Sequence, residues 1–222
     1  MKTAYYKYTI ITYLILFSLT INAKVNFTPE QVVKLKNKEI LININYKNNK
    51  SWPTFNLISY LDTSALEAFA VFSQFNLQKK YVLNVIESKA KQEKANIVDV
   101  NYILDLPWPI PNAKYTNRHE FSKISKNEYL LKWKQLKSTS ADECFGEARF
   151  FEQDGKTLIS YRNYIKPSSA LAFLFKSKMK KDTLKNLKVI IKIINDWTKN
   201  KNSNYQNSMK KINLILSNKI AY

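Results

Sequence analysis

The chain has 222 residues, of which 45% are hydrophobic and 14% aromatic, so it is long and apolar enough to form one domain with a large core. Its two glycines, Gly146 and Gly155, are too few for a fold built on glycine-rich phosphate loops. The formal charge is +19, but only three residues are arginine, and arginine is the usual choice for bidentate contacts to nucleic acid. We therefore expect no nucleic-acid partner, and weak association with an anionic membrane surface stays open.

The first 23 residues have the layout of a secretory signal peptide. Lys2 and Lys7 precede an uncharged, largely apolar run over residues 8–21, and Ala23 is a small residue at a plausible cleavage point. The pattern predicts export, to the periplasm or the extracellular space, with a mature chain that starts near Lys24. An uncleaved N-terminal anchor is the alternative.

The next part of the chain mixes helices and strands. Thr28 followed by Pro29 is a helix start, and the pattern predicts a helix over residues 27–37. Alternating apolar and polar residues predict strands over 39–46, 55–62, 82–88 and 96–106, with a helix over 65–75 between the second and third. The lysine-rich segment 89–94 is interpreted as a turn.

The second half reads as strands that end in a long helix. A proline-rich segment at 107–111 must leave the sheet, because proline has no N–H to donate. Strands are expected over 115–124, 128–136, 143–151 and 157–165, the last two joined at Asp154-Gly155, a hairpin turn signal. A long amphipathic helix follows over 170–198. We assign residues 24–199 to one domain and 200–222 to a polar tail with room for a short helix.

This order of elements is that of the α+β helix-grip fold, a curved antiparallel sheet wrapped around a long C-terminal helix. The chain also resembles the START-like (SRPBCC) superfamily, in particular exported bacterial proteins of the polyketide cyclase/dehydrase and lipid transport family. The resemblance covers about residues 27–198. The matching segments are Phe27–Ile42, Ser59–Phe75, Tyr102–Pro109 (YILDLPWP) and Thr157–Pro167 (TLISYRNYIKP).

The chain departs from the family pattern after the proline-rich segment. Related proteins often have Ser or Asn, then Arg-Asp, where this chain has Pro111-Asn112-Ala113, and Arg118 comes later. A role that depends on that Arg–Asp pair therefore does not transfer to this sequence.

A sheet wrapped around one helix implies an apolar cavity between them, and strand alternation nominates its lining. Tyrosine and tryptophan are favoured as ligand-orienting residues because their polar atoms need partners when buried. Arg149 would suit a carboxylate or phosphate group if it faced inward, and a surface position is the alternative. The candidate lining residues are Val100, Tyr102, Leu104, Tyr129, Leu131, Trp133, Arg149, Ile159, Tyr161, Leu174, Phe175 and Leu187.

The resemblance and the candidate residues together favour non-enzymatic binding or transport of a lipid or other hydrophobic small molecule. The inward faces carry tyrosines and almost no carboxylate or histidine, whereas an acid–base enzyme needs such groups. A cyclase- or hydrolase-like enzyme and an interaction module with a filled core are the alternatives. With one cysteine, Cys144, and one histidine, His119, we expect no metal site, no cofactor and no catalytic residue. His119 is expected at the surface or near the cavity.

Overall fold

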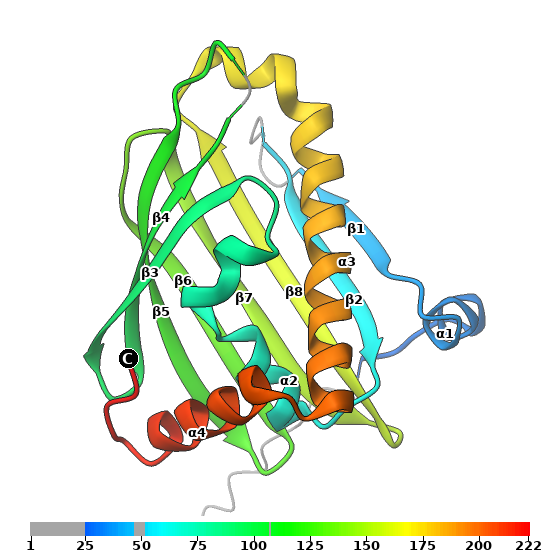
Figure 1. Cartoon of the computed structure of the whole chain (residues 1–222). Helices are drawn as coiled ribbons and strands as arrows, with labels where there is room; N and C mark the ends of the chain where they lie inside the picture. The colour runs from blue at the N-terminus through cyan, green and yellow to red at the C-terminus, as the bar shows by residue number, and fades with distance from the viewer. Residues whose placement is uncertain (1–24, 47–51, 107) are drawn as a thin grey trace, which may run out of the picture.

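The computed structural model describes residues 25–46, 52–106 and 108–222, so the predicted signal peptide lies outside the described residues. The strands form one antiparallel sheet in the order β1-β2-β8-β7-β6-β5-β4-β3 (Figure 1). The sheet therefore has β1 and β3 at its edges. The strands are β1 (Leu41–Asn45), β2 (Thr54–Leu61), β3 (Val85–Lys94), β4 (Ile97–Leu104), β5 (Ala113–Ser125), β6 (Glu128–Ser138), β7 (Ala141–Gln153) and β8 (Lys156–Pro167).

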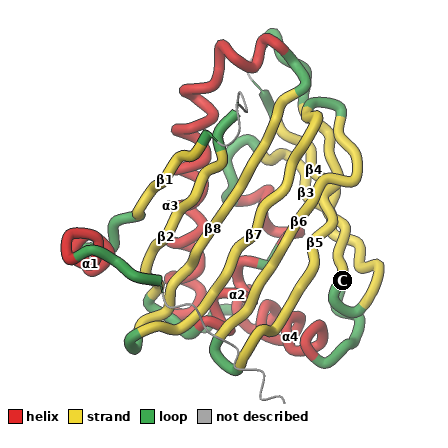
Figure 2. The backbone as a smooth tube through the Cα atoms, turned by 180° about the vertical axis from the view of Figure 1, so that it is seen from behind, coloured by secondary structure: helices red, strands yellow, loops and turns green. Residues whose placement is uncertain are grey.

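The sheet is curved, and α3 lies across its concave face, while the convex face carries no helix (Figures 1 and 2). Helices α2, η1 and α4 lie on the concave face beside α3, and α1 lies beyond the β1 edge. The α+β helix-grip prediction is confirmed. The helices are α1 (Pro29–Lys36), α2 (Ala65–Phe72), η1 (Phe75–Lys80), η2 (Ala170–Phe175), α3 (Lys176–Asn200) and α4 (Ser203–Leu216).

Local sequence signals start the helices and turn the strands. A capping box begins α2, in which the Ser64 hydroxyl accepts from the Glu67 backbone N–H and the Glu67 side chain accepts from the Ser64 N–H. Between β7 and β8, Asp154 and Gly155 have φ values of 52° and 71°. A tight hairpin turn requires such positive values, and Asp and Gly adopt them readily.

Aromatic side chains from the sheet pack around α2 to form the centre of the core. The Phe69 ring stacks on Tyr129 with a centroid distance of 5.4 Å, and it also contacts Phe121 and Phe150. Phe69 is fully buried. Truncation of so well packed an aromatic side chain costs about 3–5 kcal/mol, so α2 contributes strongly to the stability of the fold.

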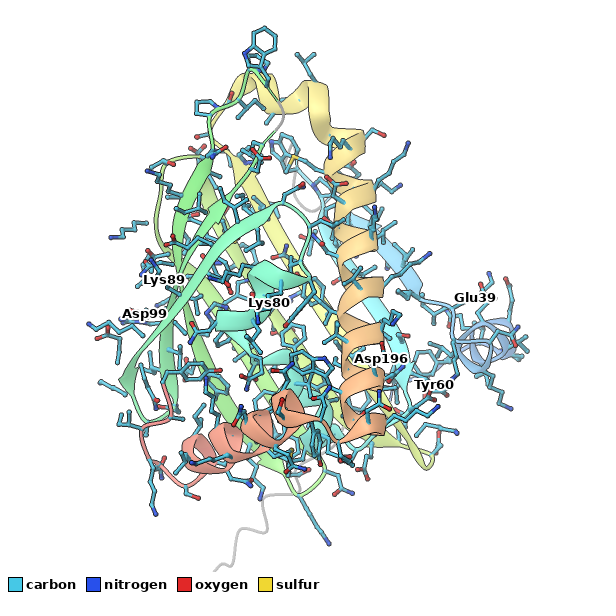
Figure 3. All side chains as sticks on the ribbon, in the orientation of Figure 1. Glu39, Tyr60, Lys80, Lys89, Asp99 and Asp196 are labelled. Atoms are coloured by element: carbon cyan, nitrogen blue, oxygen red, sulfur yellow. The ribbon has the colours of Figure 1, made fainter. Side chains whose placement is uncertain are left out.

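The lysine-rich segment 89–94 is a strand, so the prediction of a turn is wrong. β3 continues to Lys94 and pairs with β4 along its length. Lys89 and Lys91 are exposed and alternate with the more buried Ser88 and Ala90. Figure 3 shows Lys89 and Asp99 pointing away from the helices. Charged side chains on an edge strand disfavour pairing with another chain. This explains why the second half of β3 has the lysine-rich composition of a turn.

The C-terminal segment contains the helix for which the sequence leaves room, α4, and this helix packs into the core. Tyr205, Ile212 and Ile215 of α4 are buried in the same cluster as α2. The Tyr222 ring lies 6.0 Å from that of Phe75. The physical reason is that α4 has its own apolar stripe, which covers the end of the concave face that α3 leaves open. Among the described residues, no helix is long and apolar enough to cross a membrane.

Candidate functional site

Two adjoining cavities lie between the concave face of the sheet and α3. Their volumes are about 450 Å³ and about 220 Å³, and we call them the larger and the smaller cavity. The larger cavity lies near the β4–β5 connection and η2, and the smaller one lies deeper, against α2 and η1. Because they share part of their lining, a ligand in one can extend into the other. The shared residues are Leu83, Leu104, Tyr115, Cys144, Ile165, Thr183 and Asn186.

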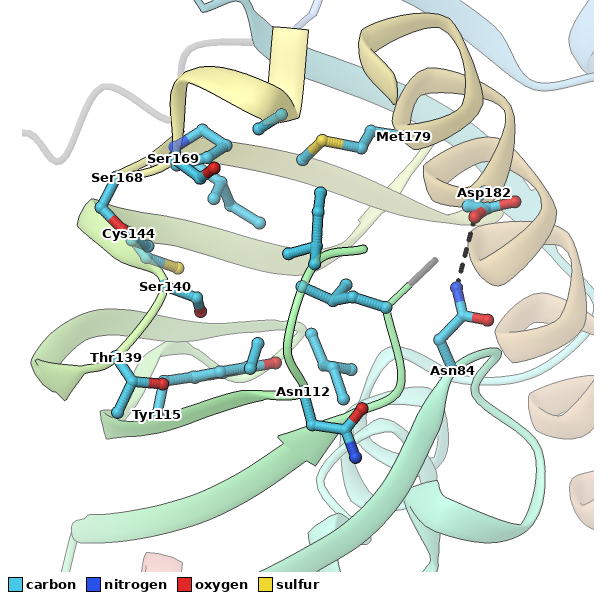
Figure 4. Close-up of a pocket in the computed structure, with 18 of the residues that line it drawn as sticks. Asn84, Asn112, Tyr115, Thr139, Ser140, Cys144, Ser168, Ser169, Met179 and Asp182 are labelled. Carbon is cyan, nitrogen blue, oxygen red and sulfur yellow. Dashed lines mark hydrogen bonds between the residues drawn. The ribbon is translucent and has the colours of Figure 1, made fainter. Parts of the chain in front are cut away.

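The larger cavity is mostly apolar, with one charged pair in its lining. Figure 4 shows Met179 and Asp182 of α3 across the space from Tyr115 and Cys144 of the sheet. The Asp182 carboxylate accepts from Lys178 Nζ at 2.6 Å and from Asn84 Nδ2 at 3.2 Å. The negative charge of Asp182 is thus compensated by a neighbour on its own helix, and Lys178 is not an unpaired cation available to a ligand.

The smaller cavity is lined by aromatic residues whose polar atoms are partly bonded to one another. The Tyr102 ring stacks on Tyr115 at 5.1 Å, and the Tyr102 hydroxyl donates to Gln78 Oε1 at 2.8 Å. The Trp133 Nε1–H donates to Asn163 Oδ1 at 3.3 Å. These bonds fix the orientation of two large side chains and so give the cavity a defined shape.

Gly146 lets the Trp133 indole lie flat against β7. Trp133 pairs with Gly146, and Gly146 pairs with Asn163 on β8, so the indole crosses the glycine to reach its hydrogen-bond partner. A Cβ atom at position 146 would overlap the Trp133 ring and the Arg162 carbonyl oxygen. One of the chain's two glycines therefore shapes the cavity wall.

The titratable groups that line the smaller cavity are neutral near pH 7. Burial lowers the pKa of His119 to about 4. Hydrogen bonds with the backbone of Asn117 and Val98 raise the pKa by a smaller amount. Burial also raises the pKa of Cys144 to about 11 and raises the pKa of Tyr115 and Tyr161. Among the described residues, no Asp, Glu, Lys or Arg lines this cavity. The site can therefore supply shape, apolar surface and neutral hydrogen bonds.

Five of the predicted lining residues border the smaller cavity, and Leu104 borders both. These five come from three strands and from α3, so the strand alternation indicated the correct face of the sheet. They are Tyr102, Leu104, Trp133, Tyr161 and Leu187. Their contact with a ligand stays a prediction.

Four other candidates share the inward faces but are packed in the core and border neither cavity. Val100, Leu131 and Ile159 have no exposed surface, and Tyr129 stacks on Phe69 of α2. The reason is that α2 covers part of the concave face and fills it with its own side chains. Strand alternation identifies the inward face but not which part of that face stays open.

Arg149 and Leu174 border neither of the two cavities. Arg149 lies on the convex face, where its Nε donates to Glu128 Oε1 at 2.6 Å. Of the two positions considered for Arg149, the structure therefore shows the one at the surface. Leu174 is 77% exposed and borders a third cavity of about 570 Å³ beside Trp52. The side chain of Phe175 lies outside the described part of the chain.

Most of the polar residues that line the smaller cavity are not among the predicted lining residues. Asn117 and Tyr115 on β5, and Asn163 on β8, border the smaller cavity, as does His119. The signal was the same alternation already used on the other strands, because Tyr115, Asn117 and His119 lie two residues apart along one strand. Polar residues on an inward face are the informative exception to an apolar pattern.

No protein-family model matches this chain, and no curated protein matches it by sequence. Solved structures do match, and those found include lipid-transfer proteins and aromatase/cyclases. A STAR-related lipid transfer protein from Xanthomonas axonopodis has a TM-score of 0.62 at 12% identity, over 70% of this chain and 93% of that one. For the human StAR-related lipid transfer protein 5 the TM-score is 0.56 at 10% identity, over 76% and 93%.

The Zhui aromatase/cyclase of a Streptomyces species has a TM-score of 0.52 at 9% identity, over 66% of this chain and 96% of that one. The class that the sheet, the helix and the cavity define is a helix-grip protein with an internal apolar cavity. The comparisons narrow the fold class further, since the chain has the START-like fold that the sequence resemblance predicts. At these identities the likeness concerns the fold.

Proposed function

We propose that this protein binds a lipid or another hydrophobic small molecule in the two adjoining cavities and releases it chemically unchanged. The observation that supports this most is the largely apolar, partly enclosed space between the sheet and α3. Ligand sites typically have volumes of roughly 300–1,000 Å³ and combine apolar walls with a few polar groups. The two cavities together have this character.

The neutral lining of the smaller cavity favours binding over catalysis. The aromatase/cyclases among the structural neighbours give the enzyme alternative its basis. General acid–base catalysis works best with a group whose pKa lies near the operating pH. The pKa of His119 is about 4 and that of Cys144 about 11, and neither is near 7. Ligand binding without catalysis therefore needs fewer assumptions than a cyclase or hydrolase function.

Export and contact with a membrane surface belong to the same proposal. The signal-like layout of residues 1–23 supports a location outside the cytoplasm. Intact-mass measurement on protein from its own host should find a chain that starts near Lys24, and a full-length mass in the cytoplasmic fraction would contradict export.

Exposed apolar residues next to the larger cavity support a membrane contact, since Trp108 is 90% exposed and Leu174 77%.

The binding proposal is tested by filling the space where the cavities meet. Thr183 on α3 borders all three cavities. We expect Thr183→Phe to weaken the binding of a fluorescent polyene alcohol by about tenfold or more while the free energy of unfolding changes little, because the added ring enters empty space. Lys185→Phe, at an exposed position of the same helix, is the matched control and should bind normally. Equal affinity in both variants would place the ligand elsewhere.

A further inference from the structure

Two buried polar atoms beside the smaller cavity have no hydrogen-bond partner among the described residues. They are Asn117 Oδ1 and His119 Nδ1, and both residues are 5% exposed. A buried polar group without a partner is costly, and native proteins almost always satisfy such groups with protein, water or a ligand. Two of them on one wall of a cavity therefore need an explanation.

Both side chains come from the inward face of β5 and line the same cavity. The other end of the Asn117 amide makes only a long contact, from Nδ2 to Cys144 Sγ at 3.8 Å. The His119 ring lies 4.4 Å from that of Phe75 and 6.1 Å from that of Trp133, so neighbouring rings hold it in place. Two residues along a strand span about 7 Å, so the two atoms lie on one stretch of the same wall, where a ligand hydroxyl can bind either of them.

Within the described part of the chain, the lining of the two cavities offers no free cation. Among the described residues, no charged side chain borders the smaller cavity, and the one Lys and one Asp that border the larger cavity are paired with each other. A carboxylate or phosphate group brought into this space would lose its hydration without gaining a counter-ion, which is strongly unfavourable. The chemistry of the wall favours an uncharged polar group.

We propose that the smaller cavity binds the hydroxyl group of a neutral hydrophobic ligand, which donates its hydrogen to Asn117 Oδ1 or His119 Nδ1. This inference rests on the proposed function. A hydroxyl group also accepts hydrogen bonds. The Tyr115 and Tyr161 hydroxyls border the same cavity, and neither takes part in the hydrogen bonds of the described residues. The lining of the smaller cavity thus includes both acceptors and donors for a hydroxyl group.

The test compares dodecanol, dodecyl methyl ether and dodecanoate, which differ only at the polar end, as competitors of a fluorescent polyene alcohol. We expect dodecanol to compete about tenfold better than the ether, which lacks the donor, and better still than the anion. Equal competition by alcohol and ether, or strongest competition by dodecanoate, would overturn the hydroxyl assignment while the binding function stands. If neither the fluorescent alcohol nor any of the three compounds binds, both proposals fail.

Variants assign the preference to the two side chains. Asn117→Leu combined with His119→Phe should remove the preference for the alcohol over the ether. The ligand-free protein should be as stable as the wild type or more so, because apolar side chains replace unpaired polar ones. Asn101→Leu, at an exposed position of the neighbouring β4, is the control and should keep the preference. A preference that persists in the double variant would overturn the assignment.

Discussion

The contact between Trp133 and Gly146 shows how a single residue shapes the cavity. The indole crosses β7 where the only inward glycine lies, and its N–H reaches Asn163 on the next strand. Any side chain at position 146 would occupy the same space as the ring. The glycine is needed here because of close approach, since its backbone has an ordinary strand conformation.

We therefore predict that Gly146→Ala lowers the free energy of unfolding by about 1–3 kcal/mol, the usual cost of overpacking. The methyl group meets a ring and a backbone carbonyl group, and the carbonyl cannot move without disturbing β8. Urea unfolding measures the change. Gly155→Asn is the control, because nothing lies near that glycine and asparagine tolerates its positive φ. A Gly146→Ala variant as stable as the wild type would contradict the assigned close contact.

At the scale of elements, Glu67 joins α2 to α4. Its carboxylate completes the capping box of α2, accepts from the Tyr205 hydroxyl at 2.8 Å and pairs with Lys201. Burial acts to raise the pKa of Glu67, but hydrogen bonds from Lys201, Ser64, Tyr205 and Thr63 outweigh it and lower the pKa to about 2. One side chain thus connects the start of one helix to the start of another.

The lowered pKa of Glu67 predicts a loss of stability in acid. An unfolded glutamate has a pKa of about 4.3. The stabilisation is therefore complete above that value and disappears as the pH falls through about 2. We expect Glu67→Gln to reduce the free energy of unfolding at pH 7 by about 1 kcal/mol, because hydrogen bonds to a charged group become neutral ones. The variant should lose less stability than the wild type between about pH 4.5 and 2.

Urea unfolding at several pH values tests this prediction. Glu30→Gln is the matched control, since Glu30 is exposed and pairs only with Lys34 on the same helix. Exposed pairs of this kind contribute little to stability, because solvent screens them. Parallel stability curves for Glu67→Gln and the wild type below pH 4.5 would show that Glu67 does not link α2 and α4 in the way described.

At the scale of the whole molecule, exposed apolar side chains and lysine side chains gather at one end. The β4–β5 connection, which carries Trp108, and η2, which carries Leu174, lie at the same end of the molecule (Figure 1). Both segments contribute residues to the lining of the larger cavity. Residues 176–181, directly after η2, include four lysines. Apolar side chains next to cations suit an anionic bilayer surface, and a ligand could leave the cavity there without crossing water.

We predict that the protein binds vesicles that contain phosphatidylglycerol better than vesicles of phosphatidylcholine alone, and less well at high salt, because salt screens exposed charges. Changing both Trp108→Ser and Leu174→Ser should reduce the bound fraction about tenfold, since two large apolar side chains no longer enter the bilayer. Co-sedimentation measures the bound fraction.

Ile124→Ser is the control for the vesicle experiment. Ile124 is 51% exposed and lies near the end of β5, away from the β4–β5 connection. Serine at this position should leave vesicle binding unchanged. Equal losses in the double variant and in the control would show that the association depends on general charge and not on this end of the molecule.

The sequence by itself determined the number, type and order of most elements. Alternation with a period of two and the helical stripe of α3 are local properties, so they can be read without knowing what the element packs against. The same alternation indicated the inward face that carries Tyr102, Trp133 and Tyr161. It missed the second half of β3, because an edge strand needs apolar residues on only one side, and the lysines hid the pattern.

Only the tertiary structure decided which inward residues stay open to a ligand. Leu131 and Trp133 lie two positions apart on one face of β6, yet one is core and the other lines a cavity. The difference comes from where α2, α3 and α4 pack on the sheet, which depends on contacts between residues far apart in the sequence. The unpaired atoms of Asn117 and His119 became visible for the same reason, because hydrogen-bond satisfaction belongs to the assembled fold and not to any one strand.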